Sequence, residues 1–166
     1  MEKKTEFGAV EEFHIGGNKE AEEYYLEEGP DFIVVDAVSE ALDAVQDFIE
    51  IRLQKAHCPR KSCAEIRLAV EEIFINICSY AYAPNVGRAR VRCRIKEDES
   101  YVQLQFSDHG TPFDPLKKED ADTTGKQFME REGGFGIHLV KNMMDEVDYE
   151  YRDGMNILKV KRFFLS

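Results

Sequence analysis

The sequence predicts a two-layer α/β sandwich, in which helices cover one face of a mixed, mainly antiparallel sheet. The predicted elements occur in the order strand, helix, helix, strand, strand, long loop, helix, strand, strand, which suits this architecture. The later strands alternate apolar and polar residues, as strands do when only one face is buried. With 166 residues, 43% of them hydrophobic, the chain is long enough to bury one substantial core.

The first predicted elements are a strand and two helices. The run from Phe32 to Val35 is apolar and mostly β-branched, which is typical of a buried strand. Ser39 can cap the helix that follows. The apolar residues of that helix recur at helical spacing: Leu42, Val45, Phe48, Ile49 and Leu53. The pattern from Ser62 to Glu65 fits a capping box and predicts a second helix that runs to about Tyr82.

The second half of the chain is predicted to hold four strands and one helix. Apolar residues occupy every second position over residues 89–95 and 102–106, which predicts an antiparallel pair. A helix is predicted over residues 137–145, and alternating residues on both sides of Asp153-Gly154 predict a final hairpin. The polar loop from Asp108 to about Glu132 has the length of a lid or binding loop.

The domain is predicted to span residues 31–166, preceded by an acidic N-terminal appendage over residues 1–30. The appendage carries nine Glu and three Lys, and its stretch from Lys19 to Glu28 could form a helix between flanking glycines. The whole chain has a net charge of −11, which opposes non-specific binding to nucleic acid. The acidic excess either serves solubility or attracts a neutral or basic protein partner.

No pattern in the sequence predicts export or membrane insertion. No apolar run approaches the ~18 residues needed to span a bilayer, and the charged residues 1–6 do not resemble the start of a signal peptide. The four Cys have neither CxxC nor zinc-ribbon spacing. We therefore expect a cytoplasmic protein with reduced thiols and no membrane contact.

The second predicted helix contains the most informative polar pair. From Leu68 to Tyr82 it is apolar almost all round, yet Glu72 and Asn76 lie four residues apart and so share one face. Because an unpaired buried carboxylate is costly, this pair needs a partner. A metal ion with an activated water or hydroxyl would serve, with Asn as oxygen ligand and Glu as base. The alternative is a capped or salt-bridged Glu at the helix edge.

A second group of residues follows the predicted strand 102–106. Asp108 ends the strand, and Gly110, which lacks a Cβ, lets a planar ligand approach the backbone. An Asp at this place can accept a hydrogen bond from the exocyclic amine of adenine and would disfavour the carbonyl of guanine. The alternative is a simple Asp–Gly turn.

The third signal is a glycine-rich stretch, Gly133 to Gly136, that opens the next predicted helix. Bare amides at a helix N-terminus bind phosphate, although the spacing here is not that of the GxGxxG motif. Lys126, in the preceding loop, is either a phosphate ligand or a solvated lysine.

Taken in order, these motifs resemble those of the GHKL ATPases, a group that includes gyrase, MutL, heat-shock chaperones and histidine kinases. The resemblance runs from about Phe32 to Phe164 and implies the histidine-kinase-like ATPase fold, also called the Bergerat fold. Within this group the chain is similar to the anti-sigma-factor serine kinases, in the stretches Asp108 to Pro115 and Gly133 to Val140.

The resemblance implies a role for each motif. Glu72 would be the general base, and Asn76 would be the Mg²⁺ ligand beside bound ATP. Asp108 would bind the adenine amine. The other positions that the resemblance assigns to the nucleotide are Gly110, Phe113, Lys126, Gly134, Phe135 and Gly136.

The implied activity is transfer of a phosphoryl group from MgATP to a Ser or Thr of an anti-anti-sigma (STAS-type) protein. Such kinases also sequester a sigma factor and typically form homodimers. The alternative is a non-catalytic, ATP-dependent module that binds a sigma factor or another regulator. Three positions depart from the family pattern: Tyr80 where relatives often have His, Glu132 where some have a basic residue, and Asn156 where Thr is common.

Overall fold

Six strands form one sheet in the order β1-β2-β3-β4-β6-β5. The computed structural model describes residues 24–117 and 134–164, and each of the five pairings between described strands is antiparallel. The strands are β1 (Leu26–Glu28), β2 (Phe32–Asp36), β3 (Arg88–Lys96), β4 (Tyr101–Asp108), β5 (Glu146–Arg152) and β6 (Met155–Phe163). The mainly antiparallel sheet predicted from the sequence is confirmed.

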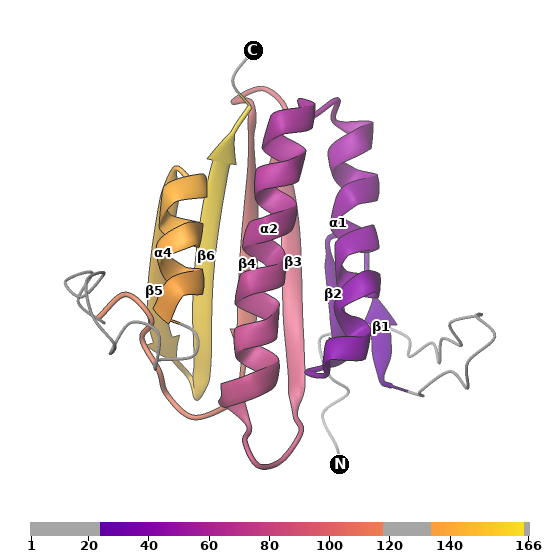
Figure 1. The fold of residues 1–166 in the computed structure, drawn as a ribbon. Helices are drawn as coiled ribbons and strands as arrows, with labels where there is room; N and C mark the ends of the chain where they lie inside the picture. Colours follow the sequence, from indigo (N-terminus) through magenta and orange to yellow (C-terminus); the bar gives the residue numbers. More distant parts are fainter. Residues whose placement is uncertain (1–23, 118–133, 165–166) are drawn as a thin grey trace.

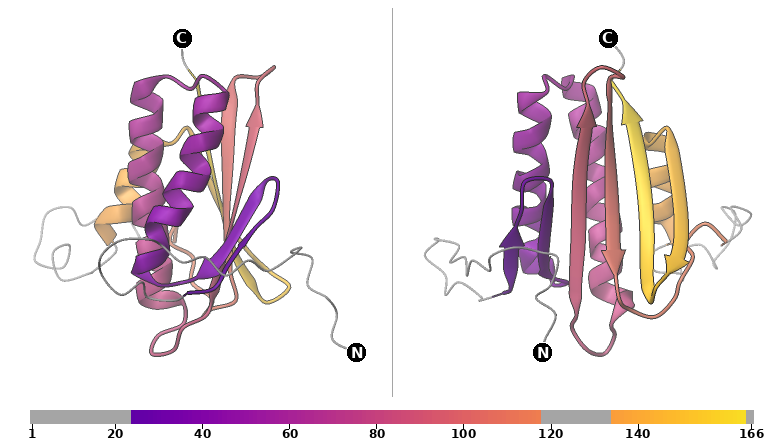
Figure 2. Two further views of the ribbon diagram at one scale, coloured as in Figure 1. Left: turned by 90° about the vertical axis from the view of Figure 1, so that its right-hand side faces the viewer. Right: turned by 180° about the vertical axis from the view of Figure 1, so that it is seen from behind.

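Three helices lie on one face of this sheet (Figure 1). They are α1 (Leu42–Lys55), α2 (Arg60–Asn76) and α4 (Gly134–Met143). Seen from the side and from behind, the opposite face carries no helix among the described residues (Figure 2). The two-layer sandwich is therefore confirmed. None of the helices described is both long and apolar enough to cross a membrane.

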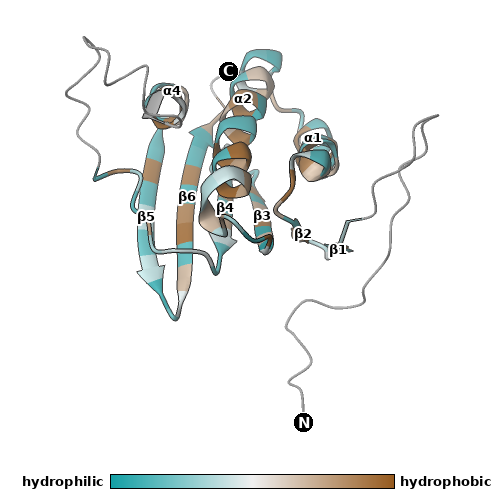
Figure 3. Ribbon diagram, turned by 60° about the horizontal axis from the view of Figure 1, so that its bottom comes forward, coloured by the Kyte–Doolittle hydropathy of each residue, from teal (hydrophilic) through white to brown (hydrophobic). Residues whose placement is uncertain are grey.

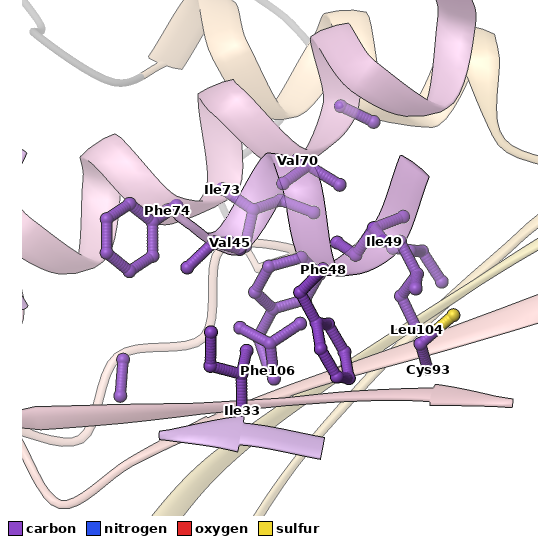
Figure 4. Close-up of a cluster of buried hydrophobic side chains, with 14 of the residues drawn as sticks. Ile33, Val45, Phe48, Ile49, Val70, Ile73, Phe74, Cys93, Leu104 and Phe106 are labelled. Carbon is purple, nitrogen blue, oxygen red and sulfur yellow. The ribbon is translucent and has the colours of Figure 1, made fainter. Parts of the chain in front are cut away.

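The hydrophobic core fills the space between the helical layer and the sheet (Figure 4). Phe48 of α1, Phe74 of α2 and Phe106 of β4 are all at most 3% exposed. Each fully buried side chain of this size contributes about 1.5–3 kcal/mol to folding. Figure 3 shows hydrophobic residues of α2 lying over the central strands. This core holds α2 against β4, and both elements supply residues to the site described below.

The starts of the first two helices differ from their predictions. A short 3₁₀ turn, Ser39–Ala41, precedes α1, and in this described segment no side-chain hydrogen bond caps either element, so Ser39 is not an N-cap. α2 begins at Arg60 after Pro59, which places Ser62 inside the helix, where it is buried. Pro59 fixes the chain in an extended conformation, so the helix starts earlier than the capping-box pattern predicts.

The predicted end of the second helix, at about Tyr82, is confirmed. After Asn76 it continues as a π-helical segment, Ile77–Ala81, that ends just before Tyr82. A π-helical turn shifts the phase of the residues that follow it, and such turns are frequent at functional sites. Here the segment brings Ile77, Tyr80 and Ala81 to the wall of a cavity.

The N-terminal part of the sheet corrects one expectation. The helix considered over residues 19–28 is wrong for its described end, because Leu26–Glu28 is a strand that pairs with β2. Tyr24 and Leu26 belong to the core. Residues 24–28 are thus part of the sandwich. The predicted N-terminal appendage remains a prediction for residues 1–23. Residues 1–23, and the predicted lid from residue 118 on, lie outside the described residues.

Candidate functional site

A cavity of about 310 Å³ opens at one end of the sandwich, between α2, α4 and strands β4, β5 and β6. This volume is at the lower end of that of small-molecule sites. Most of its wall is apolar, with Ile73 of α2 and Ile137 and Val140 of α4 among the lining residues. Its polar side chains are few: Asn76, Tyr80, Asp108, Thr111, Tyr149 and Asn156.

Asp108 stands at the end of β4, where the sequence places it, and its side chain faces this cavity. It is 6% exposed. Its Oδ1 accepts hydrogen bonds from the Gly110 amide and from Nδ2 of Asn156, both at 2.9 Å. Oδ2 has no hydrogen-bond partner among the described residues, so one oxygen is held by the protein and the other is left for a ligand. Burial raises the pKa of Asp108, and the hydrogen bonds from Asn156 and Gly110 oppose that shift.

Gly110 allows two stretches of backbone to approach closely. A Cβ at this position would lie 2.2 Å from the carbonyl oxygen of Ala81, a distance that no side chain tolerates. The Thr111 amide donates to the same oxygen at 2.8 Å. The turn after β4 is therefore fixed to the end of the π-helical segment, beside the cavity. The predicted contact of Gly110 with a base remains a prediction.

Glu72 and Asn76 occupy successive turns of α2, as predicted. Asn76 lines the cavity. Glu72 lies one turn before it and faces α4, because its Oε2 is 2.5 Å from the position that a Cβ on Gly136 would take. Both side chains are half-buried, and within the described chain neither forms a side-chain hydrogen bond or an ion pair. A carboxylate and an amide that lie one helical turn apart near a cavity, with no partner in the part of the chain that the structure describes, are available to a ligand.

The structure describes the other predicted site residues to different extents. Phe113 lines the cavity and is 51% exposed. Gly134 begins α4, and Gly136 is buried in its first turn, so the glycine-rich stretch does open a helix. For Gly134 and Phe135 the structure gives the backbone element only. Lys126 lies outside the described residues.

Asn156 is a site residue that the sequence marked only as a departure from the family pattern, without a role in the site. It is 8% exposed at the start of β6, paired with Asp108 across the sheet. Its side chain forms hydrogen bonds with Asp108, Thr111, Phe113 and Tyr149, and a longer one with Gly110. One signal could have found it: positions 156, 158 and 160 share one face of the strand, so a polar residue at 156 points toward the helical layer.

The site offers few protein ligands to a divalent cation. Among described residues no group of three or more His, Cys, Asp or Glu side chains is placed to hold one. The oxygens of Asn76 and Glu72 are suitable donors for Mg²⁺, which commonly binds one or two protein oxygens and takes its other ligands from water and from substrate phosphates. The residues present thus fit a cation that arrives with a phosphate-bearing ligand.

Among the described residues, the two-layer sandwich thus combines a cavity, a buried carboxylate in its wall and a helix that opens on glycine. Comparison with known families identifies the kind of domain. The family described as "Histidine kinase-like ATPase domain" matches residues 35–162, well over half of the chain. The protein belongs to this family, the GHKL ATPases.

Individual relatives are similar over shorter stretches. The serine-protein kinase RsbW of Oceanobacillus iheyensis is 30% identical over 106 residues, which cover 61% of this chain and 66% of that protein. The serine/threonine-protein kinase BtrW of Bordetella bronchiseptica is 27% identical over 93 residues, 56% of this chain and 65% of that protein. The match thus spans slightly under two thirds of each of these relatives. A histidine kinase domain from Erythrobacter litoralis aligns in structure with a TM-score of 0.44 at 16% identity, over 64% of this chain and 46% of that one.

Proposed function

We propose that the protein binds ATP in the cavity and transfers its γ-phosphoryl group to a Ser or Thr hydroxyl of a protein partner. The observation that carries this proposal is the Asp108 carboxylate, which is buried with one oxygen held and the other open to the cavity. Membership of the ATPase family and similarity to proteins named serine-protein kinases support it.

Asp108 recognises the nucleobase of the bound nucleotide. Its open Oδ2 accepts a hydrogen bond from a ligand donor, and the exocyclic amine of adenine is such a donor. Guanine presents a carbonyl at the same place, and two acceptors facing each other in a buried site leave both unpaired, which costs about 1–3 kcal/mol. The apolar walls provided by Ile73, Ile137 and Phe113 suit the faces of a purine.

Glu72 and α4 supply the reactive end. The amides of the first turn of α4, from Gly134 to Gly136, are free of intrahelical partners and favour the charge of a phosphate. Lys126 is proposed as a further phosphate ligand. A magnesium ion bound through Asn76 would neutralise phosphate charge. Glu72 takes the proton of the attacking hydroxyl as the new O–P bond forms and the bond to the leaving ADP oxygen breaks.

The partners follow from the same resemblance. We propose an anti-anti-sigma (STAS-type) protein as the phosphorylated substrate and a sigma factor as the sequestered partner, with the kinase as a homodimer in the cytoplasm. A non-catalytic ATP-dependent binding module is the second candidate, because Glu132 stands before the glycine run where some relatives have a basic residue.

Transfer of label from γ-labelled ATP to an anti-anti-sigma protein tests the proposal. Glu72→Gln should lower transfer at least about 100-fold, in line with the loss of a general base, while ATP binding stays within a factor of three. Glu71→Gln is the matched control, because Glu71 is the exposed neighbour on the same helix. Wild-type ATP binding without any transfer would favour the binding module, and unchanged transfer by Glu72→Gln would remove Glu72 from the mechanism.

A further inference from the structure

We propose that Asn156 is a positioning residue that sets the base preference of the cavity, by fixing the Asp108 carboxylate and the turn at residues 110–113 as one unit. The inference rests on the proposed binding of an adenine nucleotide. It concerns a side chain that is not expected to touch the reacting atoms and whose effect is exerted through Asp108.

The Asn156 amide is fully used by the protein. Nδ2 donates to Asp108 Oδ1 at 2.9 Å and to the carbonyl oxygen of Thr111 at 3.0 Å. Oδ1 accepts from the Phe113 amide at 3.0 Å and from the Tyr149 hydroxyl at 2.5 Å. One buried side chain therefore connects the end of β4, the turn that follows it, and β5.

The neighbours of Asn156 leave only one orientation for its amide. The Phe113 backbone amide can only donate, so the oxygen of Asn156 must face it. The nitrogen must then face Asp108, which as a carboxylate can only accept. The Tyr149 hydroxyl adds a second donor to the oxygen side and stabilises the same orientation. A flipped amide would place its NH₂ group against the Phe113 N–H donor and its oxygen against the Asp108 carboxylate acceptor.

This arrangement fixes the place at which the second Asp108 oxygen meets the ligand. With Oδ1 occupied by Asn156 and Gly110, the carboxylate cannot rotate without breaking two hydrogen bonds. Asn156 also carries no charge, so it holds the carboxylate without neutralising it. A Lys or Arg at this position would neutralise the carboxylate. The remaining oxygen is thus kept in a fixed place as an acceptor, which favours an amine donor over a carbonyl.

The matched pair Asn156→Thr and Asn156→Val tests this role. The two side chains have nearly the same shape, and only Thr can donate to Asp108. Inosine triphosphate is the probe, because it differs from ATP in carrying a carbonyl in place of the exocyclic amine. We expect Thr to keep the wild-type ratio of ATP to ITP affinity within about threefold and Val to lower it at least tenfold. Asn142→Ala, a change at an exposed residue of α4, is the control.

Equal ATP to ITP ratios in wild type, Asn156→Thr and Asn156→Val would overturn the inference. Should the Val variant fail to fold, Tyr149→Phe takes its place: the ratio should fall about threefold, and an unchanged ratio would overturn the role of the orientation. A wild-type protein that binds neither nucleotide, or binds both equally, would instead contradict the proposed function, so the two failures are distinguishable.

Discussion

The Glu72 carboxylate occupies the space that a side chain on Gly136 would fill. The Oε2 atom lies 2.5 Å from the position of a Cβ built on that glycine, with no backbone atom of α2 as close. Because Gly136 is in the first turn of α4 and Glu72 lies one turn before the end of α2, the missing side chain lets the proposed base reach the helix end proposed to hold phosphate.

Gly136→Ala should therefore reduce phosphoryl transfer without unfolding the protein. The clash involves the mobile end of a Glu side chain, so Glu72 can move aside, and Ala in place of Gly favours a helix by up to about 1 kcal/mol. We expect transfer to fall at least tenfold while the melting temperature stays the same or rises. In a Glu72→Ala background the substitution should cause no further loss of transfer; a further tenfold loss there would show that Gly136 acts independently of Glu72.

Asp108 should make stability depend on pH. Burial raises its folded-state pKa above 3.8, so the protonated form favours the folded state. The stabilisation is complete below the unfolded pKa and is lost as pH rises through the folded pKa. The Asn side chain of the Asp108→Asn variant does not titrate. As pH rises through the folded-state pKa of Asp108, the melting temperature of the variant should therefore rise relative to that of the wild type. A constant difference between the two proteins from pH 3 to 8 would contradict the burial of this carboxylate.

The element pattern was predictable because local alternation and long-range pairing agree. In β3 and β4 the apolar residues Val91 and Phe106 lie opposite each other, as the period-two pattern requires. Strand β1 was not predictable from the sequence. It lies in an acidic run, which usually indicates a solvated segment, yet Glu27 is wholly buried there. The start of α2 was also misplaced, since a strong capping pattern lay one turn inside the helix.

The candidate site was predictable only where its residues are close in sequence. Glu72 and Asn76 are one turn apart, and Asp108 and Gly110 share a turn, so spacing alone reveals them. Asn156 acts on residues 43 to 48 positions earlier in the chain. Such contacts arise from the antiparallel pairing of β4 with β6. The alternation along β6 shows which way Asn156 faces, but it does not show which residues Asn156 meets.

Three of the four thiols should resist alkylation in the folded protein. All four Cys are free, and burial raises the pKa of Cys58, Cys78 and Cys93 to about 12. At pH 8 their thiolate fraction is therefore small, and the thiolate is the reactive form. We expect iodoacetamide to label these three at least tenfold more slowly in native than in denatured protein, as followed by mass spectrometry of each peptide. Equal rates at Cys93 would contradict its place in the core.

Calorimetric titration of the protein with ATP and with GTP, in the presence of Mg²⁺, tests the central claim most directly. Asp108 holds one open acceptor oxygen toward the cavity, so ATP should bind at least tenfold more tightly than GTP, a difference of about 1.4 kcal/mol. Asp108→Asn should remove that preference. Equal affinities for the two nucleotides, or a preference that survives in Asp108→Asn, would contradict the account.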